Sequence, residues 1–180
     1  VEKQVVIGLS HVPDKPGIAA DLFETLSKGG INVDLIIQST HEGSSNDITF
    51  TIAQNDLEKT KLLCEGLIKS LGGELSIEEQ MSKLSIRGVG IIGRPGIAAK
   101  LFETISKCGI NLRLIATSEV KVSCVIESNV GGKALRGVIE AFEINNDQVQ
   151  VNPKIIETNE PAVRGVALDT NQVQVSVINL

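Results

Sequence analysis

The chain has 180 residues, a formal net charge of −5 and four aromatic side chains, all of them phenylalanine. Phosphate-binding surfaces need clustered Lys and Arg, and single strands stack on aromatic rings, so we do not expect nucleic acid as a partner. No apolar run approaches the roughly 20 residues of a membrane helix and no basic-then-apolar leader opens the chain, so no membrane partner is expected either.

The first half of the chain predicts four strands and two helices from its hydrophobic periodicity. In chain order they are strand 3–11, helix 17–30, strands 31–39 and 47–54, helix 56–73 and strand 74–80. Pro16, in the turn "VPDKPG", is expected at the first helical position, and Asp56 is expected to cap the second helix. The segment "THEGSSN" between the two middle strands is predicted to be a polar loop.

The second half repeats this order. Between 14–36 and 93–115, sixteen of twenty-three positions are identical, at an offset of 95 − 16 = 79 residues. The predicted elements are strand 83–90, helix 94–108, strands 110–118 and 119–128, helix 131–144 and strand 147–153. A period of this length indicates a duplicated folding unit rather than a solenoid repeat.

The order strand–helix–strand–strand–helix–strand predicts an α+β fold of two ferredoxin-like units, each with an antiparallel sheet. We place the first domain at 1–80, the second at 81–152 and a linker with a strand hairpin at 153–180. The hairpin "VRGVALDTNQVQVSVINL" is either the start of a third unit or an extra strand at a sheet edge, and the sequence leaves both open.

Motifs for catalysis are missing from the chain. Gly88-Val-Gly90-Ile-Ile-Gly93 matches the dinucleotide fingerprint G-x-G-x-x-G, but the first unit has "SHVPDK" there and Pro95 follows at once. A glycine-rich turn is the preferred interpretation. No nucleophile constellation and no metal-ligand spacing occurs, so the fragment is predicted to be non-catalytic, without cofactor or metal. The three cysteines are widely spaced and form no C-x-x-C pair, which favours reduced thiols in a cytoplasmic protein.

The turn before each first helix is the candidate binding site. "DKPGIAA" and "GRPGIAA" put free backbone N–H groups at a helix N-terminus, which suits a carboxylate. Asp14 or strand carbonyls can take an ammonium group, and Gln38 or Thr117 can contact a side chain. A pocket for a zwitterion is one interpretation. The other is that Pro-Gly only builds the turn and that the asparagines which begin the next strands, Asn32 and Asn111, only cap it.

The sequence also resembles a known family. "PDKPG" followed by "INVDLIIQS" resembles an ACT domain, and the tandem with "LSIRGVGIIGRPGIAAKLFETIS" and "INLRLIATSEVKVSCVI" resembles the regulatory region of aspartokinases. The resemblance covers residue 3 to about residue 144. It implies feedback inhibition of an aspartate kinase catalytic domain by an amino-acid effector, threonine or lysine.

The resemblance further implies a homodimer, in which the first unit of one chain lies beside the second unit of the other and the effector binds between them. Carried over by motif, the effector contacts are Asp14, Gly17, Ile18, Ala19 and Gln38 from one chain and Asn111, Leu112 and Thr117 from the other. Gly93 replaces Asp14 in the second unit. This difference favours one well-formed effector site per pair of units, made mainly by the turn of the first unit. A structural pair that only dimerises the kinase, or the ACT module of another biosynthetic enzyme, are the alternatives.

Overall fold

The computed structural model describes residues 2–41, 45–89, 91, 94–150 and 175. Six strands are present in this part of the chain: β1 (Glu2–Pro13), β2 (Val33–His41), β3 (Ser45–Ala53), β4 (Glu74–Arg87), β5 (Leu114–Ser118) and β6 (Lys121–Glu127). The α-helices are α1 (Ile18–Lys28), α2 (Leu57–Leu71), α3 (Ile97–Lys107) and α4 (Gly131–Phe142). Short 3-10 helices lie at η1 (Gln54–Asp56), η2 (Ser128–Val130) and η3 (Asn146–Gln148). The predicted tail hairpin falls outside the described residues, apart from Val175.

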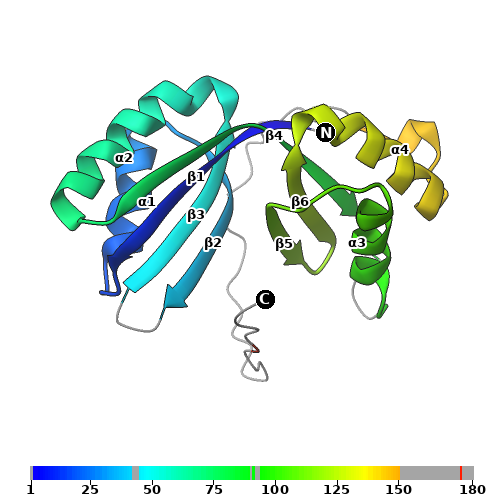
Figure 1. The fold of residues 1–180 in the computed structure, drawn as a ribbon, viewed down its shortest axis with the longest axis horizontal. Helices are drawn as coiled ribbons and strands as arrows, with labels where there is room; N and C mark the ends of the chain where they lie inside the picture. Colours follow the sequence, from blue (N-terminus) through cyan, green and yellow to red (C-terminus); the bar gives the residue numbers. More distant parts are fainter. Residues whose placement is uncertain (1, 42–44, 90, 92–93, 151–174, 176–180) are drawn as a thin grey trace, which may run out of the picture.

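The six strands form one sheet in the order β2-β3-β1-β4-β6-β5, and every neighbouring pair is antiparallel. Helices α1 and α2 accompany the first half of the sheet, and α3 and α4 the second half (Figure 1). The predicted α+β class with antiparallel pairing is therefore confirmed, and the two units are joined within a single sheet.

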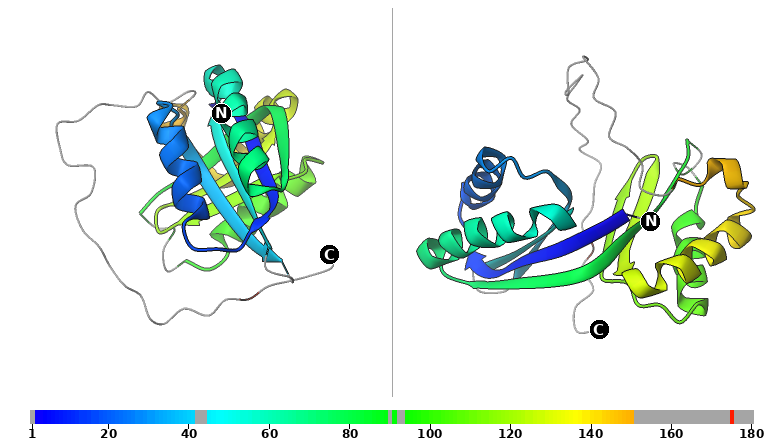
Figure 2. Two further views of the ribbon diagram at one scale, coloured as in Figure 1. Left: turned by 90° about the vertical axis from the view of Figure 1, so that its left-hand side faces the viewer. Right: turned by 90° about the horizontal axis from the view of Figure 1, so that it is seen from above.

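Strand β4 joins the two units. The strands predicted at 74–80 and 83–90 are one continuous strand, which pairs with β1 over Glu74–Lys83 and with β6 over Met81–Arg87. Seen from above, β4 runs along the molecule from one unit to the other (Figure 2). Its segment between Glu74 and Arg87 contains no glycine or proline, so nothing in the backbone interrupts it. The boundary placed between residues 80 and 81 thus falls inside a strand.

A bulge bends β4 near that boundary. The register between β1 and β4 shifts between Gln4 and Val6, and Gln80 takes a positive φ of 57°. A bulge of this kind increases the local twist of a strand. The bend therefore sits where β4 passes from one unit to the other.

Two details at helix starts differ from the sequence prediction. Helix α1 begins at Ile18 with Gly17 as its N-cap, so Pro16 lies before the helix rather than at its first position. Asp56 stands at the N-cap position of α2 but makes no side-chain cap. Instead, its carbonyl oxygen accepts a hydrogen bond from the Thr60 hydroxyl at 2.8 Å.

The last predicted strand, 147–153, is wrong over its described part. Residues 146–148 form η3 and residues 149 and 150 lie in no strand, while 151–153 fall outside the described residues. Helix α4 ends at Phe142, and its C-cap Glu143 has a left-handed conformation. A local turn follows, in which the Gln148 N–H bonds the Asn145 carbonyl at 3.0 Å. The Gln148 side chain also accepts from the Asn145 N–H at 3.2 Å, so local hydrogen bonds replace strand pairing here.

Each unit has its own core between helices and sheet. Phe50 and Phe23 form an edge-to-face pair in the first core, with ring centroids 5.9 Å apart. The second core is built from aliphatic residues around Leu101 and Ile105 of α3. A third cluster is formed by buried residues from β1, β2, β4 and β6, namely Val6, Leu35, Met81 and Val125. This cluster ties the two units together.

All three cysteines are free thiols, and two lie in the cores. Burial raises the pKa of the Cys64 and Cys124 thiols to about 11. Cys108, at the end of α3, is only half-buried.

We expect iodoacetamide at pH 8 to label Cys64 and Cys124 at least a hundredfold more slowly in the native chain than in the urea-unfolded chain. The reactive thiolate is scarce when the pKa is about 11, compared with about 8.5 in an unfolded chain. Mass spectrometry of tryptic peptides gives the rate at each site. Equal native and unfolded rates at these two sites would contradict the burial seen here.

Candidate effector site

The turns before α1 and α3 share one backbone geometry. Gly17 and Gly96 stand at the N-cap positions with φ values of 102° and 96°, which glycine adopts without side-chain strain. Neither turn has a side-chain cap in the described part of the chain. In α1 the Ile18 N–H bonds the Lys15 carbonyl at 3.4 Å. The next N–H groups of the first turn, those of Ala19 and Ala20, lie at the positive end of the helix dipole, where a carboxylate binds well.

Asp14 places a carboxylate beside the first of these turns. It follows β1 directly and is exposed, and its Oδ1 accepts a hydrogen bond of 2.7 Å from Nδ2 of Asn46. Gly17 is exposed, whereas Ile18 and Ala19 lie in the first turn of α1 and pack against the first core. The N-terminus of α1 thus combines hydrogen-bond donors with a nearby anion.

Gln38 lies on a different element. It is exposed on β2, an outer strand of the sheet, opposite Ile48 of β3. No hydrogen bond of the described residues joins its side chain to the turn before α1.

The remaining predicted contacts lie in the second unit. Asn111 is exposed and Leu112 packs against the second core, both between the end of α3 and the start of β5. Thr117 is exposed on β5, opposite Val122. Among the described residues, no hydrogen bond joins this group to Asp14 or Gln38.

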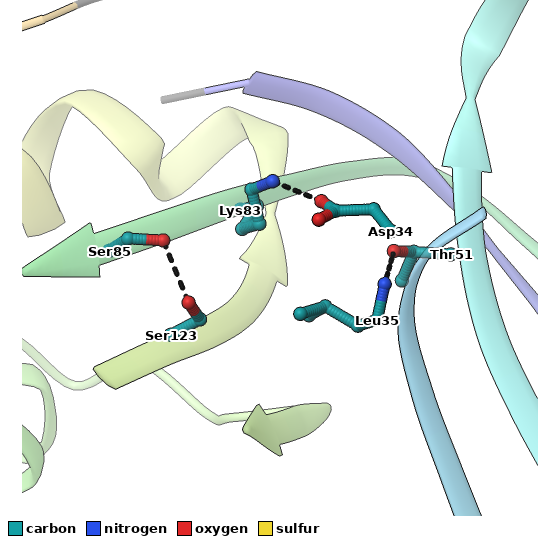
Figure 3. A network of polar contacts seen from close by, with 6 residues as sticks. All are labelled: Asp34, Leu35, Thr51, Lys83, Ser85 and Ser123. Carbon is teal, nitrogen blue, oxygen red and sulfur yellow. Dashed lines mark hydrogen bonds and ion pairs between the residues drawn. The ribbon is translucent and has the colours of Figure 1, made fainter. Parts of the chain in front are cut away.

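Figure 3 shows three polar contacts along the sheet, of which the ion pair between β2 and β4 joins the two units. Lys83 of β4 forms an ion pair with Asp34 of β2, and the Leu35 N–H donates to the Thr51 hydroxyl at 3.2 Å. Further along β4, the Ser85 and Ser123 hydroxyls lie 2.9 Å apart. Because Lys83 and Asp34 come from opposite units, the turn before α1 keeps a defined place relative to the second unit.

Comparison with known proteins identifies the repeated unit. The model of a family described as ACT domain matches residues 6–65 and 84–142, once in each half of the chain. The chain belongs to the ACT domain family. Both matches contain the turn and first helix that recur in the sequence, so the predicted ACT tandem is confirmed.

Relatives of known identity define the type of ACT pair. An aspartokinase of Thermus thermophilus is 38% identical over 141 residues, which make up 77% of this chain and 35% of that protein. The crystal structure of the ligand-free regulatory subunit of aspartate kinase from Thermus thermophilus has 37% identity and a TM-score of 0.74, over 79% of this chain and 94% of that chain. Aspartate kinase from Synechocystis has 39% identity and a TM-score of 0.82, over 91% of this chain and 28% of that one.

The two ACT domains thus form a regulatory region of the aspartokinase type, as the sequence motifs indicated. The chain spans about a third of the length of the curated aspartokinases it matches.

A groove of about 820 Å³ lies in the second ACT domain, and its lining includes Arg94 in the turn before α3 and Ser118, which follows Thr117. It is bordered by β4 beyond Lys83, where β1 pairing ends, and by apolar side chains of α4 such as Val138 and Phe142. In the first ACT domain the corresponding place is filled by β4, whose Leu75 and Ile77 pack against the core. We therefore interpret the groove as the place of a fourth strand and not as an effector pocket.

The described part of the chain gives no evidence for a metal site or for a membrane-spanning helix. No cluster of three or more His, Cys, Asp or Glu side chains there could hold a metal ion. None of the helices in that part has the length and apolar character needed to span a bilayer.

Asn46 is a further candidate residue, which the sequence did not predict. It was assigned to the polar loop 40–46, but β3 already begins at Ser45 and the Asn46 side chain is buried beside Asp14. The antiparallel pairing of β3 with β1 sets Asn46 opposite Val12, close to the turn before α1. Only knowledge of this pairing could have predicted the contact between Asn46 and Asp14.

Proposed function

We propose that this chain is the effector-binding part of an aspartokinase, and that threonine, lysine or both bind to it and inhibit the catalytic domain. The observation that carries the proposal is the turn before α1, where uncapped N–H groups lie beside the Asp14 carboxylate. Helix N–H groups suit a ligand carboxylate, and a carboxylate suits an ammonium group. An α-amino acid carries both charges next to each other.

The proposed site is completed by a second copy of the chain. β2 and β5 are the outer strands of the sheet, and they expose Ile36 to 52% and Ile115 to 43%. Unpaired strand edges with exposed apolar side chains favour docking. In the proposed homodimer the first ACT domain of one chain lies beside the second of its partner, which brings Asn111, Leu112 and Thr117 to the effector.

The proposed partner of the region is the aspartate kinase catalytic domain, and the proposed location is the cytoplasm, where thiols stay reduced. Control of this kind requires a coupling free energy of about 1–3 kcal/mol between effector and catalytic sites. Of these proposals, amino-acid binding to the regulatory region can be tested directly on this chain.

Isothermal titration with L-threonine and then L-lysine, together with sedimentation, tests the proposal. We expect saturable binding of at least one amino acid to a dimer. A folded dimer that binds neither would support the rival interpretation, a structural ACT pair that only holds two kinase chains together.

Gln38→Ala is expected to weaken effector binding roughly tenfold and to leave the dimer intact, because it removes one hydrogen bond to the ligand side chain. Titration calorimetry gives the dissociation constant and sedimentation gives the mass. Gln54→Ala is the matched control, because the Gln54 side chain bonds Glu79 instead, at 3.2 Å. Unchanged affinity in Gln38→Ala would remove Gln38 from the site.

A further inference from the structure

Asn46 carries a buried polar atom without a partner. Its side chain is only 5% exposed, and its Oδ1 makes no hydrogen bond among the described residues. Buried polar atoms are nearly always satisfied, so an exception at a candidate site calls for an explanation. Gln4 Oε1 and Glu78 Oε2 are also buried without a hydrogen bond among the described residues, but they lie on β1 and β4, away from the turn before α1. Glu78 Oε2 moreover has an ion-pair partner, since Arg113 Nε lies 3.5 Å away.

The position of Asn46 places this atom at the candidate site. Asn46 pairs with Val12 on one side and with Thr40 on the other, near the ends of β1 and β2. Its Nδ2 donates to Asp14 Oδ1 at 2.7 Å, and Asp14 lies three residues before the α1 N-cap, Gly17. The amide of Asn46 therefore lies directly beside the carboxylate of the turn.

The orientation of the amide is fixed by its neighbour. An ionised carboxylate accepts hydrogen bonds but cannot donate one, so the nitrogen of Asn46 must face Asp14. Rotating the amide by half a turn would set its oxygen against the carboxylate oxygen. The oxygen of Asn46 is consequently left as a free acceptor next to a second acceptor, the Asp14 carboxylate.

We propose that Asn46 is a recognition residue for the ammonium group of the effector, an inference that rests on the proposed function of the same site. Asn46 holds Asp14 in position through Nδ2, and its Oδ1, which is buried in the unliganded chain, is the acceptor that the ligand satisfies on binding. The ammonium group donates to Asp14 and to Asn46 Oδ1 while the ligand carboxylate binds the N–H groups of α1. This pair of acceptors sets the preference for amino acids over the corresponding hydroxy acids.

The second ACT domain lacks this pair of acceptors. Gly93 replaces Asp14 at the offset of 79 residues. The hairpin between β5 and β6 is also shorter than that between β2 and β3, since Ser118 of β5 already pairs with Lys121 of β6. No residue of β6 therefore reaches the place that Asn46 has on β3. The ammonium site is therefore expected once per chain, at the turn before α1.

The test compares an amino acid with its hydroxy analogue on the full chain. Calorimetry is run with L-threonine and 2,3-dihydroxybutanoate, and with L-lysine and 6-amino-2-hydroxyhexanoate, on the wild type, Asn46→Leu and Asn46→Ser. The leucine side chain keeps the γ-branched shape and removes both polar atoms, and the serine keeps one small polar group without the amide.

We expect both variants to bind the amino acid roughly tenfold more weakly while the affinity for the hydroxy acid changes by less than about twofold. A purely structural role would weaken both ligands by the same factor and overturn the assignment. An unchanged preference in the variants would do the same. Failure of the wild type to bind either amino acid would instead overturn the proposed function.

A measurement on the wild type covers the case in which neither variant folds. The side-chain amide signals of Asn46 in a ¹H–¹⁵N spectrum are expected to shift with L-threonine or L-lysine and to shift much less with the hydroxy analogue. Identical shifts with amino and hydroxy acid would contradict the proposal.

Discussion

Phe50→Ala is expected to lower the free energy of unfolding by about 3–5 kcal/mol, the range for removing a fully buried phenylalanine. The Phe50 side chain is 0% exposed on β3 and meets the Phe23 ring of α1 edge to face, with an interplanar angle of 72°. Its loss removes apolar contact between sheet and helix and leaves a cavity under α1. Because α1 carries the candidate turn at its N-terminus, effector affinity should fall as well.

Urea unfolding followed by circular dichroism measures the stability, with titration calorimetry for the effector. Leu62→Ala is the control, since Leu62 on α2 is 70% exposed and its truncation is expected to stay within about 0.5 kcal/mol of wild type. A loss for Phe50→Ala as small as that of the control would mean that α1 does not depend on this contact.

Gly73→Ala is expected to cost about 3 kcal/mol or more. Gly73 joins α2 to β4 with a φ of +95°, and a Cβ there would lie 2.5 Å from the Ser10 carbonyl oxygen of β1. The left-handed backbone alone costs an L-residue roughly 1–2 kcal/mol, and forcing two backbones apart adds a further cost. Ser10 pairs with Glu74, so the first ladder position between β1 and β4 is disturbed.

Gly30→Ala separates the cost of the left-handed backbone from the cost of the clash with Ser10. Gly30 has a similar φ of +69°, but its added Cβ would meet nothing within 4 Å. Its substitution is expected to show the conformational cost alone. Equal urea midpoints for the two alanine variants would exclude the clash with Ser10 as the larger effect.

The elements of the first unit could be predicted because each is bounded by turn chemistry. Gly29 and Gly30 end α1, and Gly72 and Gly73 separate α2 from β4, as the sequence indicated. The continuity of β4 was missed because the segments 74–80 and 83–90 were assigned to different units of the repeat. The absence of any glycine or proline from Glu74 to Arg87 was the signal for a single strand.

The candidate site was predictable only in part. The turn before α1 and the exposed Asp14 follow from local sequence, because a helix start is a local event. Asn46 depends on strand pairing across 32 residues, and no short-range pattern encodes that contact. Likewise, the alternation in 147–153 predicted a strand, but hydrogen bonds between Asn145 and Gln148 closed a turn instead.

The shared strand also constrains how this tandem can change over generations. Repeats connected by a loop can gain linker residues or lose one copy while the other stays folded. Here one residue inserted near Gln80 would slip the pairing of half of β4 and turn its buried side chains to the opposite face. The two ACT domains can diverge residue by residue, as Gly93 and Asp14 have done, but they can be inherited, shortened or exchanged only as a pair.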